Sequence, residues 1–415
     1  MKAYAIRLIV AAALFTHYIS APAEESIKIA YIGAMTGTYA LLSEERYKVF
    51  LAAADIVNSR GGVLGGKKIE MLAFDNKNDP QEALIVLKRA IDLGVQYVTS
   101  TQSSIAHAIN DAVVKHNVRN PEQRILFLDY GALDPALTEE RCNFWHFRFQ
   151  THGESQVKVL TDFIANVPSV QKVYLINEDY ALGRVVQRVS RQMLEARRPD
   201  LQIVGDDLIP LGKVKDFAPY IAKIHASGAD SVVTSNGAND LSLLVKAGSE
   251  LGINVTYYTL FAGIPGTWSS IPPAVVNRLI TVDTWNINST DRRWEQRLLD
   301  YRVKYKARSN LDYMPPYRVL DMFASAVEKS KSTDPLAVAQ ALEGMRYSGP
   351  SGEAWMRPED HQLVEPLYIL RLAKVGDSGA AHDIEGTGFG WKTEKLIAAN
   401  DMVPAIRCQM ERPAH

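Results

Sequence analysis

The chain has 415 residues, of which 47% are apolar and 22% are charged. Its 46 basic and 47 acidic side chains leave a formal net charge of −1, whereas proteins that bind nucleic acid carry a clear basic excess. The composition therefore excludes nucleic acid as the main partner, and 26 Gly with 19 Pro is too few for a fibrous or disordered chain. The length suits two or three globular domains of roughly 100–200 residues each.

The first 23 residues have the pattern of a secretory signal. Lys2 and Arg7 give a positive start, residues 8–15 form a short apolar run, and residues 21–23 offer small side chains to a signal peptidase. The apolar run is far shorter than the roughly 20 residues that a transmembrane helix needs. We therefore expect cleavage after Ala23 and export of the mature chain.

From residue 27 onward, short β-rich runs alternate with amphipathic segments. The first series predicts strands at 27–33, 69–75, 95–100 and 125–130 and helices at 43–59, 79–94 and 104–116. The second series predicts helices at 154–166, 181–197, 216–226 and 239–251 and strands at 172–177, 201–207, 230–235 and 255–261. Further on, we expect β-rich runs at 279–285 and 366–372, helices at 291–307 and 315–330, and an irregular tail at 376–415. This order predicts an α/β protein with two similar lobes, each a parallel sheet with helices on both faces.

Two cysteines, Cys142 and Cys408, lie in the part of the chain that is predicted to be exported. An even number of cysteines in an oxidising compartment favours one disulfide, and two buried free thiols are the alternative. A bond between them would tie the C-terminal tail to the body of the protein.

Loops that follow the predicted strands are the candidate binding elements. In open α/β sheets, ligands bind at the carboxyl ends of the strands, where helix N-termini attract anions. The loop at 101–104 offers the hydroxyls of Ser103 and Ser104 together with free amides, which suits a carboxylate. Helix capping uses the same residue types and is the alternative.

No motif indicates catalysis, a metal or a cofactor. Residues 386–393 approach a P-loop, but Trp391 stands where the phosphate loop needs glycine. The nine histidines lack metal-binding spacing, and the adjacent acids Glu178 and Asp179 are typical of a solvated surface. We therefore predict that the protein is not an enzyme and has no cofactor.

As a set, several segments resemble the type I periplasmic solute-binding proteins of ABC uptake systems, in the branched-chain amino acid (Leu/Ile/Val-binding) branch. The segments are residues 27–40, 54–71, 75–83, 131–138, 177–184 and 216–230. They occur in the expected order, and the resemblance extends over roughly residues 27–375.

The resemblance implies two Rossmann-like lobes joined by a three-crossing hinge, with crossings near 147–150, 281–285 and 352–356. The N-lobe would comprise residues 24–147 plus 284–354, and the C-lobe residues 148–283 plus 355–415 with the tail. The lobes would close on a solute in the cleft, and an ABC permease would recognise the closed form. The resemblance further implies a periplasmic monomer. A sensor that reports the same closure to a signalling partner is the alternative.

The resemblance also assigns the solute carboxylate to the loop Gln102, Ser103 and Ser104 and to the amides of Ala132 and Leu133. Relatives mostly have threonine at the position of Leu133, so one hydroxyl contact is absent here.

Other expected site residues come from both lobes. Tyr180 would form a wall of the cleft, and the aromatic residue found in the first loop of relatives falls on Leu42, with Tyr39 close by. In the C-lobe, the expected contacts are Asn236, Phe261 and Ala262.

The nature of the solute stays open at this point. Relatives that bind amino acids place an acid in the loop after the last C-lobe strand, but residues 259–263 contain none, and a buried ammonium without an anion is costly. Asp179 or Asp240 could substitute. The solute is therefore either an apolar amino acid or an aliphatic or aromatic organic acid, and we expect amino acids to bind no better than their des-amino analogues.

Overall fold

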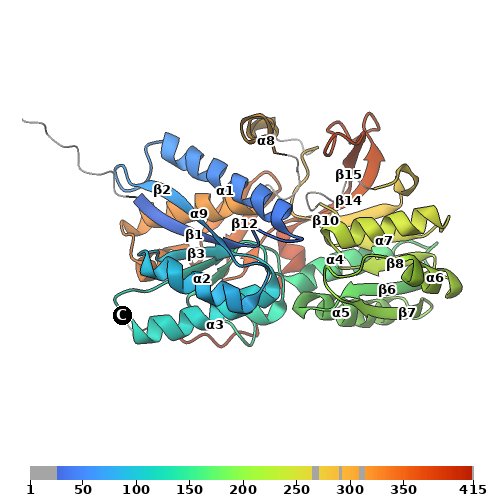
Figure 1. Ribbon diagram of the computed structural model, residues 1–415, viewed down its shortest axis with the longest axis horizontal. Coiled ribbons are helices and arrows are strands. Elements are labelled where there is room, and N and C mark those ends of the chain that lie inside the picture. The colour runs from blue at the N-terminus through green and yellow to red at the C-terminus, as the bar shows by residue number, and fades with distance from the viewer. Residues whose placement is uncertain (1–25, 264–270, 289–291, 308–313, 414–415) are drawn as a thin grey trace, which may run out of the picture.

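The computed structural model describes residues 26–263, 271–288, 292–307 and 314–413, so the predicted signal lies outside the described residues. Two α/β lobes lie side by side along the long axis of the molecule (Figure 1). The predicted fold class is confirmed, since each lobe is built on its own sheet and most of the strand pairs are parallel.

The N-lobe is built on a five-stranded parallel sheet in the order β2-β1-β3-β4-β5. Its strands are β1 (Ser26–Gly33), β2 (Lys68–Asp75), β3 (Tyr97–Ser100), β4 (Leu126–Asp129) and β5 (His146–Arg148). Its helices are α1 (Ala40–Ser59), α2 (Pro80–Asp92), α3 (Ser103–Arg119), α8 (Arg292–Tyr305), α9 (Met314–Ser330) and α10 (Pro335–Leu342). One apolar core, from Ile27 to Leu363, joins the early strands to the late helices.

The C-lobe is built on a seven-stranded sheet in the order β15-β14-β10-β9-β8-β6-β7. Its strands are β6 (Lys172–Glu178), β7 (Gln202–Ile209), β8 (Ser231–Thr234), β9 (Thr256–Thr259), β10 (Leu279–Asp283), β14 (Leu367–Lys374) and β15 (Phe389–Ile397). Its helices are α4 (Gly153–Ala165), α5 (Ala181–Arg197), α6 (Ala218–Ala226) and α7 (Ala238–Glu250).

Alternate residues of β6 explain why this sheet is covered on both faces. Val173 and Leu175 pack in one apolar cluster with α4 and α5, whereas Tyr174 and Ile176 pack in another with α6 and α7. Successive side chains of a strand point to opposite faces, so a continuous apolar run requires two covering layers.

The predicted irregular tail is wrong for residues 389–397, which form β15 and pair antiparallel with β14. The strand begins within the glycine-rich sequence around 386–390. It is half-buried, because Phe389 and Trp391 are buried and Lys392 is exposed. This placement on an antiparallel edge is not the strand–loop–helix context that a phosphate loop requires.

Three chain crossings join the lobes. The first lies between β5 and α4, and the second follows β10, because Trp285 already packs in the N-lobe core. The third follows a small antiparallel sheet of β11 (Arg346–Gly349), β12 (Gly352–Met356) and β13 (Leu363–Val364). Met356 and Leu363 pack in the N-lobe core, and Leu367 packs in the C-lobe. The third crossing is therefore later than the expected 352–356, and residues near 356–363 pack with the N-lobe rather than with the C-lobe.

A buried ion pair fastens the first crossing to the third. Arg318 Nη1 lies 2.6 Å from Glu365 Oε2, and Arg318 Nη2 donates to the carbonyl of Phe149 at 3.2 Å. The hydroxyl of Thr151 donates to Glu365 Oε1 at 3.0 Å. Arg318 and Glu365 are each only 3% exposed, so these bonds hold the crossings together inside the protein.

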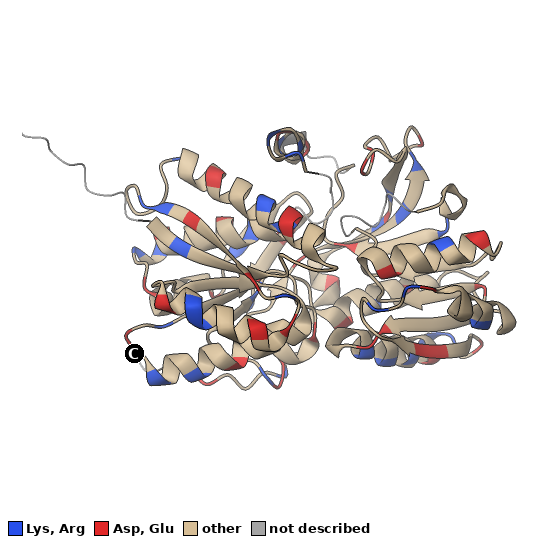
Figure 2. Cartoon of the chain, in the orientation of Figure 1, with Lys and Arg blue, Asp and Glu red and all other residues tan. Residues whose placement is uncertain are grey.

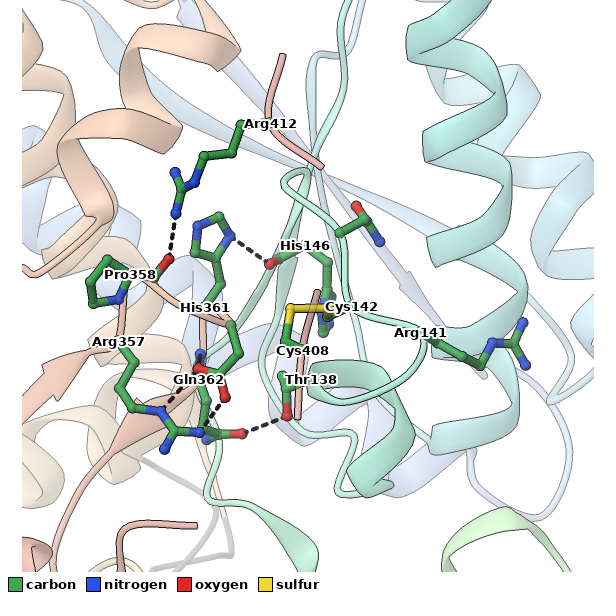
Figure 3. The surroundings of a disulfide bond; sticks show 12 residues. Thr138, Arg141, Cys142, His146, Arg357, Pro358, His361, Gln362, Cys408 and Arg412 are labelled. Carbon is green, nitrogen blue, oxygen red and sulfur yellow. Dashed lines mark hydrogen bonds and ion pairs between the residues drawn. A yellow bond between two sulfur atoms is a disulfide. The ribbon is translucent and has the colours of Figure 1, made fainter. Parts of the chain in front are cut away.

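The predicted disulfide between Cys142 and Cys408 is confirmed (Figure 3). Because Cys142 follows β4, this bond returns the end of the chain to the N-lobe, where the C-terminus lies in Figure 1. Arg407 pairs with Glu139 at 3.0 Å beside the bond. The last residues thus contact the N-lobe, in contrast to the predicted C-lobe boundaries.

Basic and acidic residues are interspersed on both lobes in the view of Figure 2, in keeping with the near-zero net charge. Among the described residues, no helix combines the length and the apolar character that crossing a membrane would require.

Candidate solute-binding site

A cavity lies between the two lobes at the carboxyl ends of their strands. It has an empty volume of about 810 Å³ when space open to solvent is included. Seven of the predicted site residues line it: Tyr39, Leu42, Gln102, Ser103, Leu133, Tyr180 and Phe261. These residues come from five loops or helix starts, which are separated in sequence and which the two sheets bring to one edge.

Four predicted residues do not line the cavity: Ser104, Ala132, Asn236 and Ala262. Asn236 and Ala262 are fully buried. The amide of Ala132 donates to Asp129 Oδ1 at 2.8 Å, which corrects the expectation that this amide is free for a solute. Ser104 is the second residue of α3, directly after Ser103, which does line the cavity.

The start of α3 leaves two backbone N–H groups available. Gln102 has a φ of 69°, and its side-chain oxygen accepts the N–H of Ile105 at 3.1 Å, so it caps the helix. Within the described chain, the N–H groups of Ser103 and Ser104 donate no hydrogen bond. The first N–H groups of a helix have no partner within the helix and favour an anion. This geometry suits a carboxylate.

Asp134 fixes the neighbouring loop against α3. Its N–H donates to Ser103 Oγ at 3.2 Å, and its carboxylate lies 2.8 Å from His107 Nε2. Burial raises the pKa of Asp134, but the hydrogen bond and charge of His107 outweigh it, so the pKa is lowered overall. Fully buried Arg148 holds the same loop by donating to the carbonyl of Asp134 at 2.5 Å. These contacts fix the position of the two free amides.

An acid faces this helix start from the other lobe. Glu178, the last residue of β6, lines the cavity and is only 4% exposed. The carboxyl group of Asp240 on α7 is close enough to act on it electrostatically, and Gly237 donates its N–H to Glu178 Oε1 at 3.3 Å. Burial, followed by the charge of Asp240, raises the pKa of Glu178 well above its usual range, and burial also raises the pKa of Asp240. The pair therefore binds a proton more readily than two ordinary carboxyl groups do, and a nearby cation would favour its release.

Two tyrosines flank the acid pair. Burial, followed by the charge of Glu178, raises the pKa of both Tyr39 and Tyr180 far above the usual tyrosine value. Both hydroxyls therefore stay neutral, and their rings provide apolar surface on opposite lobes. A Cβ atom placed on Gly212 would lie 3.4 Å from Tyr39 Oη, so α1 and the loop after β7 meet at the edge of the cavity.

The close packing of α5 against β6 requires glycine at position 183, three residues after Tyr180. A Cβ atom at this position would lie 1.8 Å from the carbonyl oxygen of Glu178. The start of α5 can therefore approach the end of β6 only because residue 183 has no side chain, and this close approach sets the position of Glu178.

Leu133 has a different role from the hydroxyl that relatives place there. It is 2% exposed and belongs to an apolar cluster of the C-lobe, although its chain segment follows β4 of the N-lobe. Its carbonyl accepts the N–H of Gly153 at 3.0 Å. Leu133 thus joins the lobes at the base of the cavity.

Sequence reasoning missed Glu178 and Arg46, which both line the cavity. The interpretation of Glu178 as a solvated acid is wrong, whereas its neighbour Asp179 is exposed and pairs with Arg184 at 2.6 Å. The position of Glu178 at the carboxyl end of a predicted strand could have indicated that it lies at the binding edge of the sheet. Asp240, named as a possible substitute anion, contacts Glu178 but does not line the cavity.

Two α/β lobes that are joined by three crossings around such a cavity define the class of two-lobed solute-binding proteins. Residues 26–380 match the family model of the periplasmic binding proteins, and the chain belongs to this family.

The names of similar proteins agree with this assignment. The chain is 29% identical over 403 residues to the Leu/Ile/Val-binding protein homolog 4 of Brucella abortus (strain 2308), and the match covers 94% of each chain. It is 23% identical to the leucine-, isoleucine-, valine-, threonine- and alanine-binding protein of Pseudomonas aeruginosa, over 80% of this chain and 85% of the relative.

Solved structures have the same fold. The leucine-, isoleucine-, valine-, threonine- and alanine-binding protein of Brucella ovis, in its closed conformation, superposes with a TM-score of 0.83 at 27% identity and covers 94% of this chain and 100% of its own. A solute-binding protein from Rhodopseudomonas palustris BisB5 in complex with 3,4-dihydroxybenzoic acid has a TM-score of 0.77 at 18% identity, over 90% and 98% of the two chains.

Proposed function

We propose that this chain is the periplasmic solute-binding protein of an ABC uptake system and that it captures a small carboxylate-bearing solute between its lobes. The observation that carries the proposal is the cavity itself, which is lined from one lobe by the start of α3, where the amides of Ser103 and Ser104 are free, and from the other lobe by Tyr180 and Phe261. A solute held from both lobes stabilises the closed arrangement, because it binds that arrangement better than the open one. Capture alone is proposed, without catalysis or a cofactor.

The lining favours an α-amino acid over an organic acid. The loop after β9 contains no acid, as noted from the sequence, but Glu178 at the end of β6 supplies one within the same cavity. An ammonium group beside Glu178 would give this buried carboxylate a charged partner, whereas a simple carboxylate solute would leave it without one. We therefore expect the protein to bind an amino acid more tightly than its des-amino analogue, in contrast to the expectation from the sequence.

Calorimetric titration of the mature protein with leucine and with 4-methylpentanoate tests the proposal. We expect leucine to bind with a dissociation constant in about the micromolar range, which corresponds to roughly −8 kcal/mol, and to bind more tightly than its analogue. If leucine and 4-methylpentanoate bind equally well, the preference for an amino acid is wrong and an organic acid is the better candidate for the solute. Binding of neither these compounds nor other small carboxylates would contradict the proposed function.

Export and assembly are part of the same proposal. The family is periplasmic by description, and we propose cleavage after Ala23 and a monomeric mature protein. Mass spectrometry of the periplasmic fraction would measure the new N-terminus, and light scattering would measure the mass of the particle. Uptake assays in strains that each lack one ABC permease would test the ABC partner.

A further inference from the structure

A second chamber adjoins the solute cavity on its hinge side. The two share the walls Arg46, Tyr130, Gly131, Leu133 and Phe261, so they are parts of one continuous cleft. The second chamber has an empty volume of about 560 Å³, again counting space open to solvent.

Eight residues line only the second chamber, of which four are polar and four, Leu260, Gly263, Val282 and Pro315, are apolar. Gln150 lies in the first crossing, and Asp283 and Thr284 lie in the second. Gln156 reaches the chamber from the first turn of α4. The solute cavity, in contrast, is walled largely by rings and apolar side chains such as Tyr180 and Leu42.

Gln156 is a buried amide whose side chain has no partner. The residue is 4% exposed, and its backbone N–H donates to His152, but its side-chain amide makes no hydrogen bond with any described residue. A primary amide offers two donors and an oxygen that accepts, and the amide of Gln156 is accessible from the chamber that it lines. The amide of Gln156 can therefore form hydrogen bonds with a group that enters the chamber.

The other polar residues of the chamber indicate which kind of solute group it could bind. Gln150 Oε1 accepts the N–H of Thr151 at 2.8 Å, and its NH₂ group donates to no described residue. Arg46 and Asp283 place one charge of each sign on the wall, and Asp283 Oδ1 accepts the N–H of Thr284 at 2.6 Å. The polar part of the wall has one charge of each sign together with donors and acceptors, so it matches a neutral amide better than it matches a lone carboxylate or ammonium, and the apolar part can pack against the methylene groups that carry the amide.

We propose that the second chamber is a subsite for an amide group carried on an extension of the solute, with Gln156 as its hydrogen-bonding partner. The inference rests on the proposed function and deepens it, because it predicts a solute that is longer than a branched-chain amino acid. The amide belongs either to a side chain, as in glutamine, or to a peptide bond, as in a dipeptide.

Calorimetry with two matched pairs of solutes tests the subsite. Glutamine against norleucine asks whether a side-chain amide is preferred over an alkyl chain of similar length, and leucylglycine against leucine asks the same of a peptide amide. Each pair is measured on the wild type, on Gln156→Leu, and on Gln340→Leu, which changes an exposed glutamine on α10 as a control.

In at least one pair, we expect the amide-bearing solute to bind about tenfold more tightly than its match, with Gln156→Leu removing that difference. Leucine should bind Gln156→Leu within about twofold of the wild type, and Gln340→Leu should change nothing. The thermal midpoint of Gln156→Leu should not fall, because no hydrogen bond within the described chain is lost. Gln156→Met carries the same test if the leucine variant does not fold.

No amide preference in either pair, or a preference that survives in Gln156→Leu, overturns the subsite. If leucine binds in that case, the proposed function stands without the subsite. If none of the solutes binds, both the subsite and the proposed function fail.

Discussion

The charge of Glu178 should decide which solutes this protein holds. Glu178→Gln keeps the shape of the side chain and removes its charge, while Asp240 and Gly237 remain beside it. Removing one partner from a buried, hydrogen-bonded charge pair costs about 2–5 kcal/mol. We therefore expect leucine to bind the variant roughly 30-fold to a few thousand-fold more weakly, and 4-methylpentanoate to bind it as well as or better than the wild type.

The same pair predicts how affinity depends on pH. Burial raises the pKa of Glu178 and of Asp240, so the empty site binds a proton at pH values where an ordinary carboxyl group has lost it. An ammonium group binds the deprotonated site, and its affinity should therefore rise with pH, by up to about tenfold per unit, until the pH exceeds the raised pKa. Calorimetry from about pH 5 to pH 8, in two buffers of different ionisation enthalpy, measures both the slope and the proton released.

Asp179→Asn is the matched control, because it removes the neighbouring acid, which is exposed and pairs with Arg184. We expect this variant to bind leucine as the wild type does. Leucine binding that is unchanged in Glu178→Gln and independent of pH would refute the role of the acid pair.

Three further changes test the framework around the site. Gly183→Ala should shift Glu178 and weaken leucine binding by about tenfold or more, because the new Cβ would overlap the carbonyl oxygen of Glu178; calorimetry that finds wild-type affinity would contradict this. Arg318→Met should lower the free energy of unfolding by about 3–5 kcal/mol in urea denaturation, since it leaves Glu365 buried without its partner. The double change C142A/C408A should lower that free energy by about 5 kcal/mol at most, because the bond closes a sequence separation of 266 residues; an unchanged denaturation midpoint would indicate that the tail is held by its other contacts alone.

Local patterns were sufficient for most of the architecture. The alternation of β-rich and amphipathic segments predicted both lobes, because buried parallel strands and their covering helices leave period-specific apolar patterns. The late strand β15 was missed because the glycines at its start resemble a turn. Its strand conformation follows from hydrogen bonding to β14, which the sequence does not show. The third crossing was placed too early because only packing shows that Met356 and Leu363 belong to the N-lobe core.

The sequence by itself predicted that the start of α3 would lie at the candidate site, since Gln102 and Ser103 follow a strand and precede a helix, and both residues line the cavity. It also left Cys408 as the only possible partner of Cys142, but two free thiols remained the alternative until the structure brought the two sulfur atoms together. The role of Glu178 was decided only by the tertiary structure. Whether a carboxyl group is solvated or buried depends on what other segments place around it, and here the helix that carries Asp240, 62 residues further along the chain, supplies the contact that changes its chemistry.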